Sequence, residues 1–121
     1  RSASFLCGLM AVVNQYKFHG KYIDAAESGT LLAPLISETI IIKSLRVTNK
    51  SGSNTPTLTL KNNGVSILWA DTLTAATSVE LLSLPLVVEG NTTLTYTTVG
   101  TVTDGVVIGI SYLNIKKEVT V

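Results

Sequence analysis

The sequence predicts an all-β domain, built as a two-sheet antiparallel sandwich of about eight strands, with a jelly roll as the expected topology. From Gly29 onward the chain is rich in Thr, Val, Ile and Leu, which suit a pleated, half-buried surface. Short runs of alternating apolar and polar residues are separated by turn-forming residues at close spacing. No alternation of strand and helix patterns is visible, so a parallel sheet is not expected.

The segment from Glu38 to Asn49 has the strongest strand pattern in the chain. It contains the run Ile40-Ile41-Ile42, which predicts that both faces of the strand are covered at its start. From Leu45 the pattern alternates, with Leu45 and Val47 expected to face inward.

A β-hairpin is predicted around Asn62-Asn63-Gly64. Both central residues of a type I′ turn need a positive φ, and the pair Asn-Gly tolerates this conformation best. The flanking strands are residues 55–61 and 65–70. Trp69, on the second of them, is expected in the core, since large rings usually contribute to core burial.

Four further segments complete the expected sandwich. Residues 30–36 should form an edge strand or an entry segment, because Pro34 cannot donate a hydrogen bond to a neighbouring strand. The others are residues 77–89, interrupted by Pro85, residues 92–99, and residues 106–115. The tail 116–121 is expected to add to an edge.

Residues 1–29 are expected to form an N-terminal arm, and residues 30–121 the sandwich domain. Leu6, Leu9, Met10 and Val13 have the spacing of an amphipathic helix, but residues 12–19 are equally compatible with an edge strand ended by Gly20. Residues 24–27 are compatible with one helical turn. The apolar stretch 5–13 is too short for a transmembrane span, and because no small-residue cleavage site follows it, we interpret it as part of an ordered arm rather than a signal peptide.

The composition favours a protein whose surface is covered by neighbouring molecules. Only 14% of the residues are charged, whereas 45% are hydrophobic. An average domain has about 25% charged residues. The net charge is +1 and the basic residues are scattered, apart from Lys116-Lys117, so the sequence gives no indication of nucleic-acid binding.

Reactive groups are scarce. The chain has one cysteine, Cys7, and one histidine, His19, which excludes a disulfide within the chain and a zinc site of the usual Cys or Cys-His types. A Cys7–His19 dyad lacks any flanking signature. A cation site at Asp24, Glu27 and His19 is not demanded by their spacing, and no glycine-rich phosphate loop occurs. We therefore expect no enzyme activity, no metal and no cofactor.

Residues 29–115 resemble small β-sandwich virion proteins of tailed bacteriophages, of the decoration or cement type. The likeness lies in the strand ending in LRVTN, the segment SVELLSLPLVVEGNTTLTYTT and the closing strand GVVIGISYLNI. Members of that family often have Gly-Asp where this chain has Gly90-Asn91. The segment before Gly29 lies outside the resemblance.

The resemblance implies a capsid decoration protein on the outer surface of a phage head, without nucleic-acid or membrane partners. Its partners would be the major capsid protein or other virion proteins, and copies of itself in a homotrimer. Assembly contacts are expected at Phe5, Leu9, Tyr16 and Phe18 in the arm.

Two alternatives stay open at this point. One is a structural component of the phage neck, tail or baseplate. The other is a carbohydrate-binding adhesin module, in which Trp69 and the loop 49–54 would face a glycan.

Overall fold

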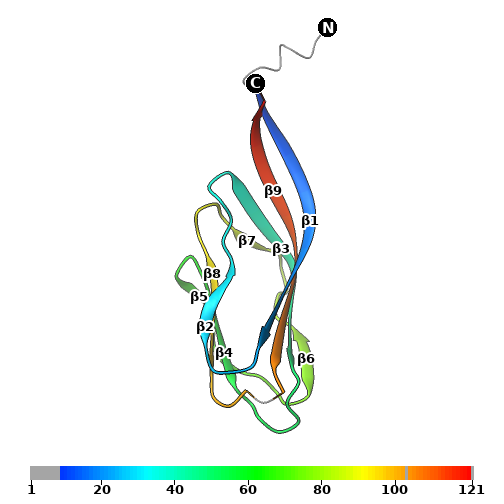
Figure 1. Cartoon of the computed structure of the whole chain (residues 1–121), viewed down its shortest axis with the longest axis vertical. Coiled ribbons are helices and arrows are strands. Elements are labelled where there is room, and N and C mark those ends of the chain that lie inside the picture. The colour runs from blue at the N-terminus through cyan, green and yellow to red at the C-terminus, as the bar shows by residue number, and fades with distance from the viewer. Residues whose placement is uncertain (1–8, 103, 121) are drawn as a thin grey trace.

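The computed structural model describes residues 9–102 and 104–120, and within them every regular element is a β-strand. Figure 1 shows the strands arranged as two facing layers. The strands are β1 (Leu9–Ile23), β2 (Ser28–Leu32), β3 (Glu38–Asn49), β4 (Thr57–Asn62), β5 (Val65–Thr72), β6 (Thr77–Glu80), β7 (Leu86–Val88), β8 (Leu94–Val99) and β9 (Val106–Thr120).

The two sheets have the strand order of a jelly roll. Sheet A has the order β1-β9-β3-β6, with β7 also paired to β3, and sheet B has the order β2-β8-β4-β5. β6 and β7 are two parts of one strand position beside β3, separated by a segment that contains Pro85. All the pairings are antiparallel. The predicted two-sheet antiparallel sandwich is therefore confirmed.

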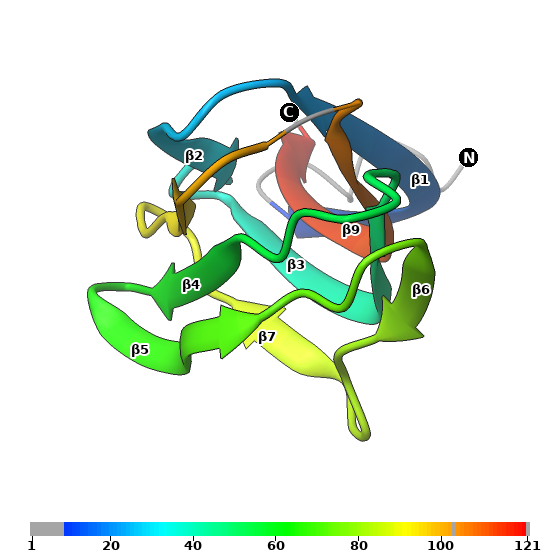
Figure 2. The same ribbon diagram turned by 90° about the horizontal axis from the view of Figure 1, so that it is seen from below.

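Figure 2 shows the two sheets from below, facing each other. The core lies between them and is filled largely from alternate positions of the strands. On β3, Leu45 and Val47 are buried as predicted, and Tyr96 on β8 faces inward against them as part of the same cluster. The fully buried side chains of β9 are Val106, Ile108 and Ile110. Strand alternation therefore explains most of the core; the exceptions are the adjacent pair Leu31 and Leu32, at a register shift in β2, and Leu73, which follows β5.

The predicted hairpin between β4 and β5 is confirmed. Asn63 has φ 52° and Gly64 has φ 78°, so both central residues of the turn occupy the left-handed region. β2 is an edge strand of sheet B, as expected, but it spans Ser28–Leu32 instead of the predicted residues 30–36, because it ends before Pro34.

The described part of the N-terminal segment is a strand. β1 pairs with β9 along its whole length, from Leu9↔Thr120 to Ile23↔Val106. The edge-strand interpretation is confirmed and the helical one is wrong for residues 9–13. Gly20 does not end the strand, because it pairs with Gly109, and residues 24–27 form no helical turn.

The outer end of β1 and β9 projects beyond the rest of sheet A. The last pair between β3 and β9 is Glu38↔Lys116, whereas β1 and β9 remain paired as far as Leu9↔Thr120. The two strands therefore continue as a two-stranded ribbon, visible at the top of Figure 1. From Leu9 onward, the segment that was expected to be an arm is thus continuous with the sandwich.

A buried amide ties the loops at the opposite end of the sandwich together. Asn49, at the end of β3, is buried, and its Nδ2 donates to the carbonyl oxygens of Asn54 (2.8 Å) and Leu73 (3.1 Å). Its Oδ1 accepts a hydrogen bond from the N–H of Ser51 at 3.1 Å. Both ends of the amide are therefore satisfied without water.

We predict that Asn49→Asp lowers the free energy of unfolding by about 2–4 kcal/mol, because a carboxylate would face two carbonyl oxygens and could not donate to either. Urea denaturation followed by circular dichroism measures this. Asn14→Asp, at an exposed position of β1, is the control and should change stability little. Equal stability of Asn49→Asp and the parent would contradict the role of this amide.

Candidate assembly surface

A band of apolar side chains crosses the outer face of sheet A. Directly paired residues share a face of a sheet, and Tyr16 pairs with Leu113, Leu113 with Ile41, and Ile41 with Val87. The band thus spans four strands. Together with Phe18 on β1, these residues form what we call the apolar patch.

The apolar patch is open to solvent in the isolated chain. Tyr16 is 80% exposed, Phe18 71% and Val87 46%, while Ile41 and Leu113 are half-buried and lie outside the core cluster. The run of three isoleucines in β3 had predicted coverage on both faces. Only the inner face is fully buried, at Ile40 and Ile42. On the outer face, no described part of the chain buries Ile41 completely.

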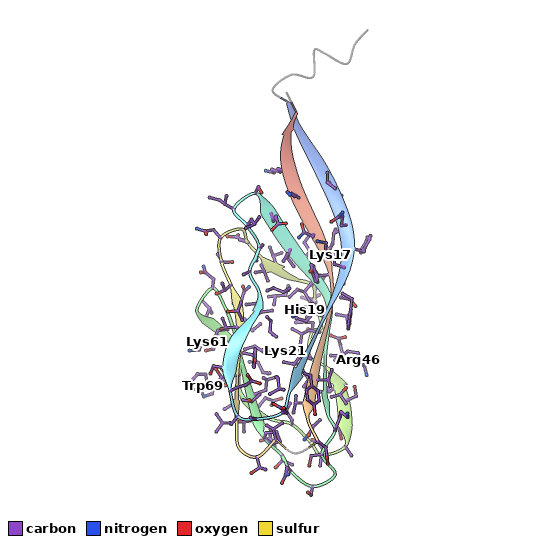
Figure 3. All side chains as sticks on the ribbon, viewed as in Figure 1. Lys17, His19, Lys21, Arg46, Lys61 and Trp69 are labelled. Carbon is purple, nitrogen blue, oxygen red and sulfur yellow. The ribbon has the colours of Figure 1, made fainter. Side chains whose placement is uncertain are left out.

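The polarity of β1 is the reverse of that expected for a strand with one solvated face. Its inward row contains Lys17, His19 and Lys21, which Figure 3 shows along the strand, whereas its outward row contains Tyr16 and Phe18. The inward direction follows from the pairing of these cations with Tyr112, Ile110 and Ile108 of β9, which face the core. The side of β1 that carries its aromatic residues is therefore the side that the sandwich does not cover.

Two glycines hold the Phe18 ring against the sheet. A Cβ at Gly20 or at Gly109 would lie 3.3 Å from an edge carbon of the ring, so the ring occupies the space above this cross-strand glycine pair. Tyr22, further along the same row, already has a partner on its face, because the Lys50 ammonium lies 5.8 Å from its ring centre. The uncovered aromatic surface of β1 is therefore concentrated at Tyr16 and Phe18.

The carboxylate of Glu38 lies near Lys17 of β1 and Lys116 of β9. Glu38 accepts hydrogen bonds from the N–H of Leu35 (2.8 Å) and from Nδ2 of Asn114 (3.3 Å). The Leu35 N–H is the largest influence that holds the pKa of Glu38 below its ordinary value; partial burial opposes it, and Asn114, Lys116 and Lys17 reinforce it. Glu38 therefore stays ionised, and its hydrogen bond with Asn114 connects the start of β3 to β9.

We predict that Glu38 makes stability depend on pH in the acid range. Because its folded pKa is lower than the unfolded value, its contribution is present above pH 4.5 and is lost as the pH falls through the folded pKa. The melting temperature should be nearly constant down to about pH 5 and then fall, and Glu38→Gln should flatten part of that fall. Thermal melts at stepped pH measure this, with Glu89→Gln as the control. An unchanged profile in Glu38→Gln would contradict the assignment.

The structure places two of the four expected contact residues together. Tyr16 and Phe18 lie on the same face of β1 and are both exposed. Phe5 lies outside the described residues, and Leu9 lies in β1 but its side chain is outside the described part. Ile41, Val87 and Leu113 were missed, because only the lateral pairing of distant strands brings them beside Tyr16.

Trp69 was expected in the core, and this is wrong. The ring is 72% exposed on the outer side of sheet B, beside Lys61 (Figure 3). Leu68 packs against the core, so Trp69, the next residue along β5, faces outward by ordinary strand alternation. A β-bulge follows at Ala70, which has φ 45° and whose N–H is bound by the Thr59 hydroxyl at 2.9 Å. The prediction rested on ring size alone, and it is wrong because Leu68, not Trp69, occupies the inward position of this strand.

The candidate metal ligands do not come together in the part of the chain that the structure describes. Within residues 9–102 and 104–120 no group of three or more His, Cys, Asp or Glu side chains could hold a metal ion. Asp24, Glu27 and His19 are therefore not brought together as a cation site, and Cys7 lies outside the described residues. The same part of the chain contains no helix long and apolar enough to cross a membrane.

No family model matches this chain, and a search of curated proteins finds no match.

Proposed function

We propose that this chain is a structural protein of a bacteriophage virion, and specifically a non-enzymatic decoration protein that binds the outside of the capsid. One observation carries the proposal: the apolar patch on the outer face of sheet A, with Tyr16 80% and Phe18 71% exposed. The resemblance of residues 29–115 to phage decoration proteins supplies the class of assembly.

The apolar patch suits a partner that stays bound in a permanent complex. Exposed contiguous apolar surface marks interaction sites in folded proteins, and aromatic residues are enriched where binding energy is concentrated. The chain has only 14% charged residues, so the charged groups elsewhere on its surface do little to offset the loss of solubility that an exposed apolar face causes. Covering the patch would remove apolar area from water and thereby stabilise both partners.

In this proposal the protein acts as a cement. Each copy adds contact area between neighbouring capsid subunits and so raises the free energy needed to separate them. A ring of three copies would in addition cover strand edges such as that of β5, which has a paired strand on one side only among the described residues.

We predict that the double variant Tyr16→Ser/Phe18→Ser folds normally but binds the shell at least about tenfold more weakly. The variant should fold because both rings are mostly exposed, and it should bind poorly because it lacks the aromatic part of the patch. The assay is co-expression with the major capsid protein of the same genome, followed by sedimentation of the assembled shells.

The matched control is Trp69→Ser, which removes a ring of similar exposure from sheet B. It should co-sediment with shells like the parent. Equal binding by all three proteins would refute docking through the patch. Association of the parent with purified necks or tails, and not with shells, would refute the capsid position and favour the neck, tail or baseplate alternative.

A second candidate, a carbohydrate-binding module, is favoured by the exposure of Trp69 alone. Its ring borders a shallow groove with the Thr57, Thr59 and Thr97 side chains and Lys61, and an exposed indole stacks well on sugar rings. The loop 49–54 does not line this groove. A glycan array with the parent and Trp69→Ser tests it: binding lost in the variant supports this candidate, and no binding by the parent removes it.

A further inference from the structure

The free edge of β1 is the longest unpaired strand edge among the described residues. β1 has 15 residues and all its pairing partners lie on β9. In an antiparallel pair, alternate residues direct their N–H and C=O groups toward the partner, and the remaining residues direct theirs to the other side. About half of the backbone groups of β1 thus point to an edge that can hydrogen-bond an added strand.

The side chains along this edge form two rows of different chemistry. On the outer face of sheet A the row contains Tyr16 and Phe18, and on the inner face it contains Lys17, His19 and Lys21. A strand added to β1 would place its own alternate side chains directly beside these rows. Apolar residues would then lie beside the aromatic rings, and acidic residues beside the cations.

The same rows disfavour a second copy of this chain at the edge. In a two-fold antiparallel pairing centred on His19, Lys17 of one copy would lie opposite Lys21 of the other. Like charges directly opposite one another destabilise a sheet. Cations that point inward on an edge strand are also a common protection against pairing between identical molecules.

Nearby acids leave the cationic row available. Glu38 interacts with Lys17, but its oxygens are already engaged by Leu35 and Asn114. Lys21 interacts with Tyr96 and lies near Glu27 at the base of the strand. Lys17 is exposed and His19 and Lys21 are half-buried, so all three retain access to a neighbouring strand.

We propose that the edge of β1 binds an extended segment of a partner protein in which acidic and apolar residues alternate. The segment extends sheet A by one strand; its apolar residues continue the apolar patch, and its acidic residues face Lys17, His19 and Lys21. This inference rests on the proposed assembly role of sheet A and adds the chemistry of the partner.

Synthetic peptides test the proposal on the full chain. The probe is a capped peptide, about nine residues long to span Gln15 to Ile23, that alternates glutamate and valine. One comparison peptide alternates lysine and valine, and another has the glutamate and valine residues in separate blocks. Calorimetric titration should show binding of the alternating acidic peptide at least about tenfold tighter than either comparison.

Charge reversal provides the specific control. Lys17→Glu/Lys21→Glu should lose affinity for the acidic peptide by about tenfold and gain it for the lysine peptide. Lys61→Glu/Ser53→Glu/Ser83→Glu, which makes the same change in net charge at exposed positions outside β1, should retain the parent's preference. Equal effects of the two variants would show that only overall charge matters and would overturn the proposal.

Hydrogen exchange locates the added strand. In the free protein about half of the amides of residues 13–23 should exchange fast, and the acidic peptide should slow them. If all amides of residues 13–23 exchanged slowly without peptide, the edge would already be occupied, and the proposal would be overturned. If the peptide slowed exchange only outside β1, it would bind at a different site, which would also overturn the proposal. Shell binding that survives Lys17→Glu/Lys21→Glu but not Tyr16→Ser/Phe18→Ser would overturn this inference while leaving the proposed function intact.

Discussion

The register between β1 and β9 is the constraint on which the surface chemistry of this protein depends. Side chains alternate along a strand, so a slip of one residue would move every side chain of β1 to the other face. The observed register places Ile23 opposite Val106, where both are fully buried, and seats Phe18 over the pair Gly20 and Gly109. The same register turns the aromatic row outward.

That register leaves the aromatic row of β1 uncovered within the single chain. A strand shifted by one residue would turn Tyr16 and Phe18 toward sheet B, but it would also expose Ile23, which is fully buried. The chain instead keeps the cations at the margin of the core, where long lysine stems can cover apolar groups while their ammonium groups reach water. An uncovered aromatic row is consistent with a fold that is completed by a partner.

Local patterns were sufficient to predict most of the sandwich. The alternation in β3 and the Asn63-Gly64 turn depend on neighbouring residues only, and both have the structure that was predicted. β1 was ambiguous for a physical reason: its apolar residues near Leu9 and Val13 fit a helix as well as a strand, and its partner β9 lies at the far end of the chain. Only that long-range pairing decides between the two.

The candidate surface was less predictable than the fold. Tyr16 and Phe18 stand out as aromatic residues in an exposed strand, but their neighbours Leu113, Ile41 and Val87 come from three other strands, and no spacing in the sequence relates them. The prediction for Trp69 rested on ring size, which does not say which face of β5 points inward; Leu68 occupies the inward position, so alternation turns Trp69 outward.

Hydroxyl-radical footprinting, read by mass spectrometry on the free protein and on shells that carry it, tests the central claim most directly. The rings of Tyr16 and Phe18 should be oxidised readily in the free protein and be strongly protected on the shell, while Trp69 reacts in both. Equal oxidation of Tyr16 and Phe18 in the two states would contradict the claim that this face of sheet A is the one the assembly covers.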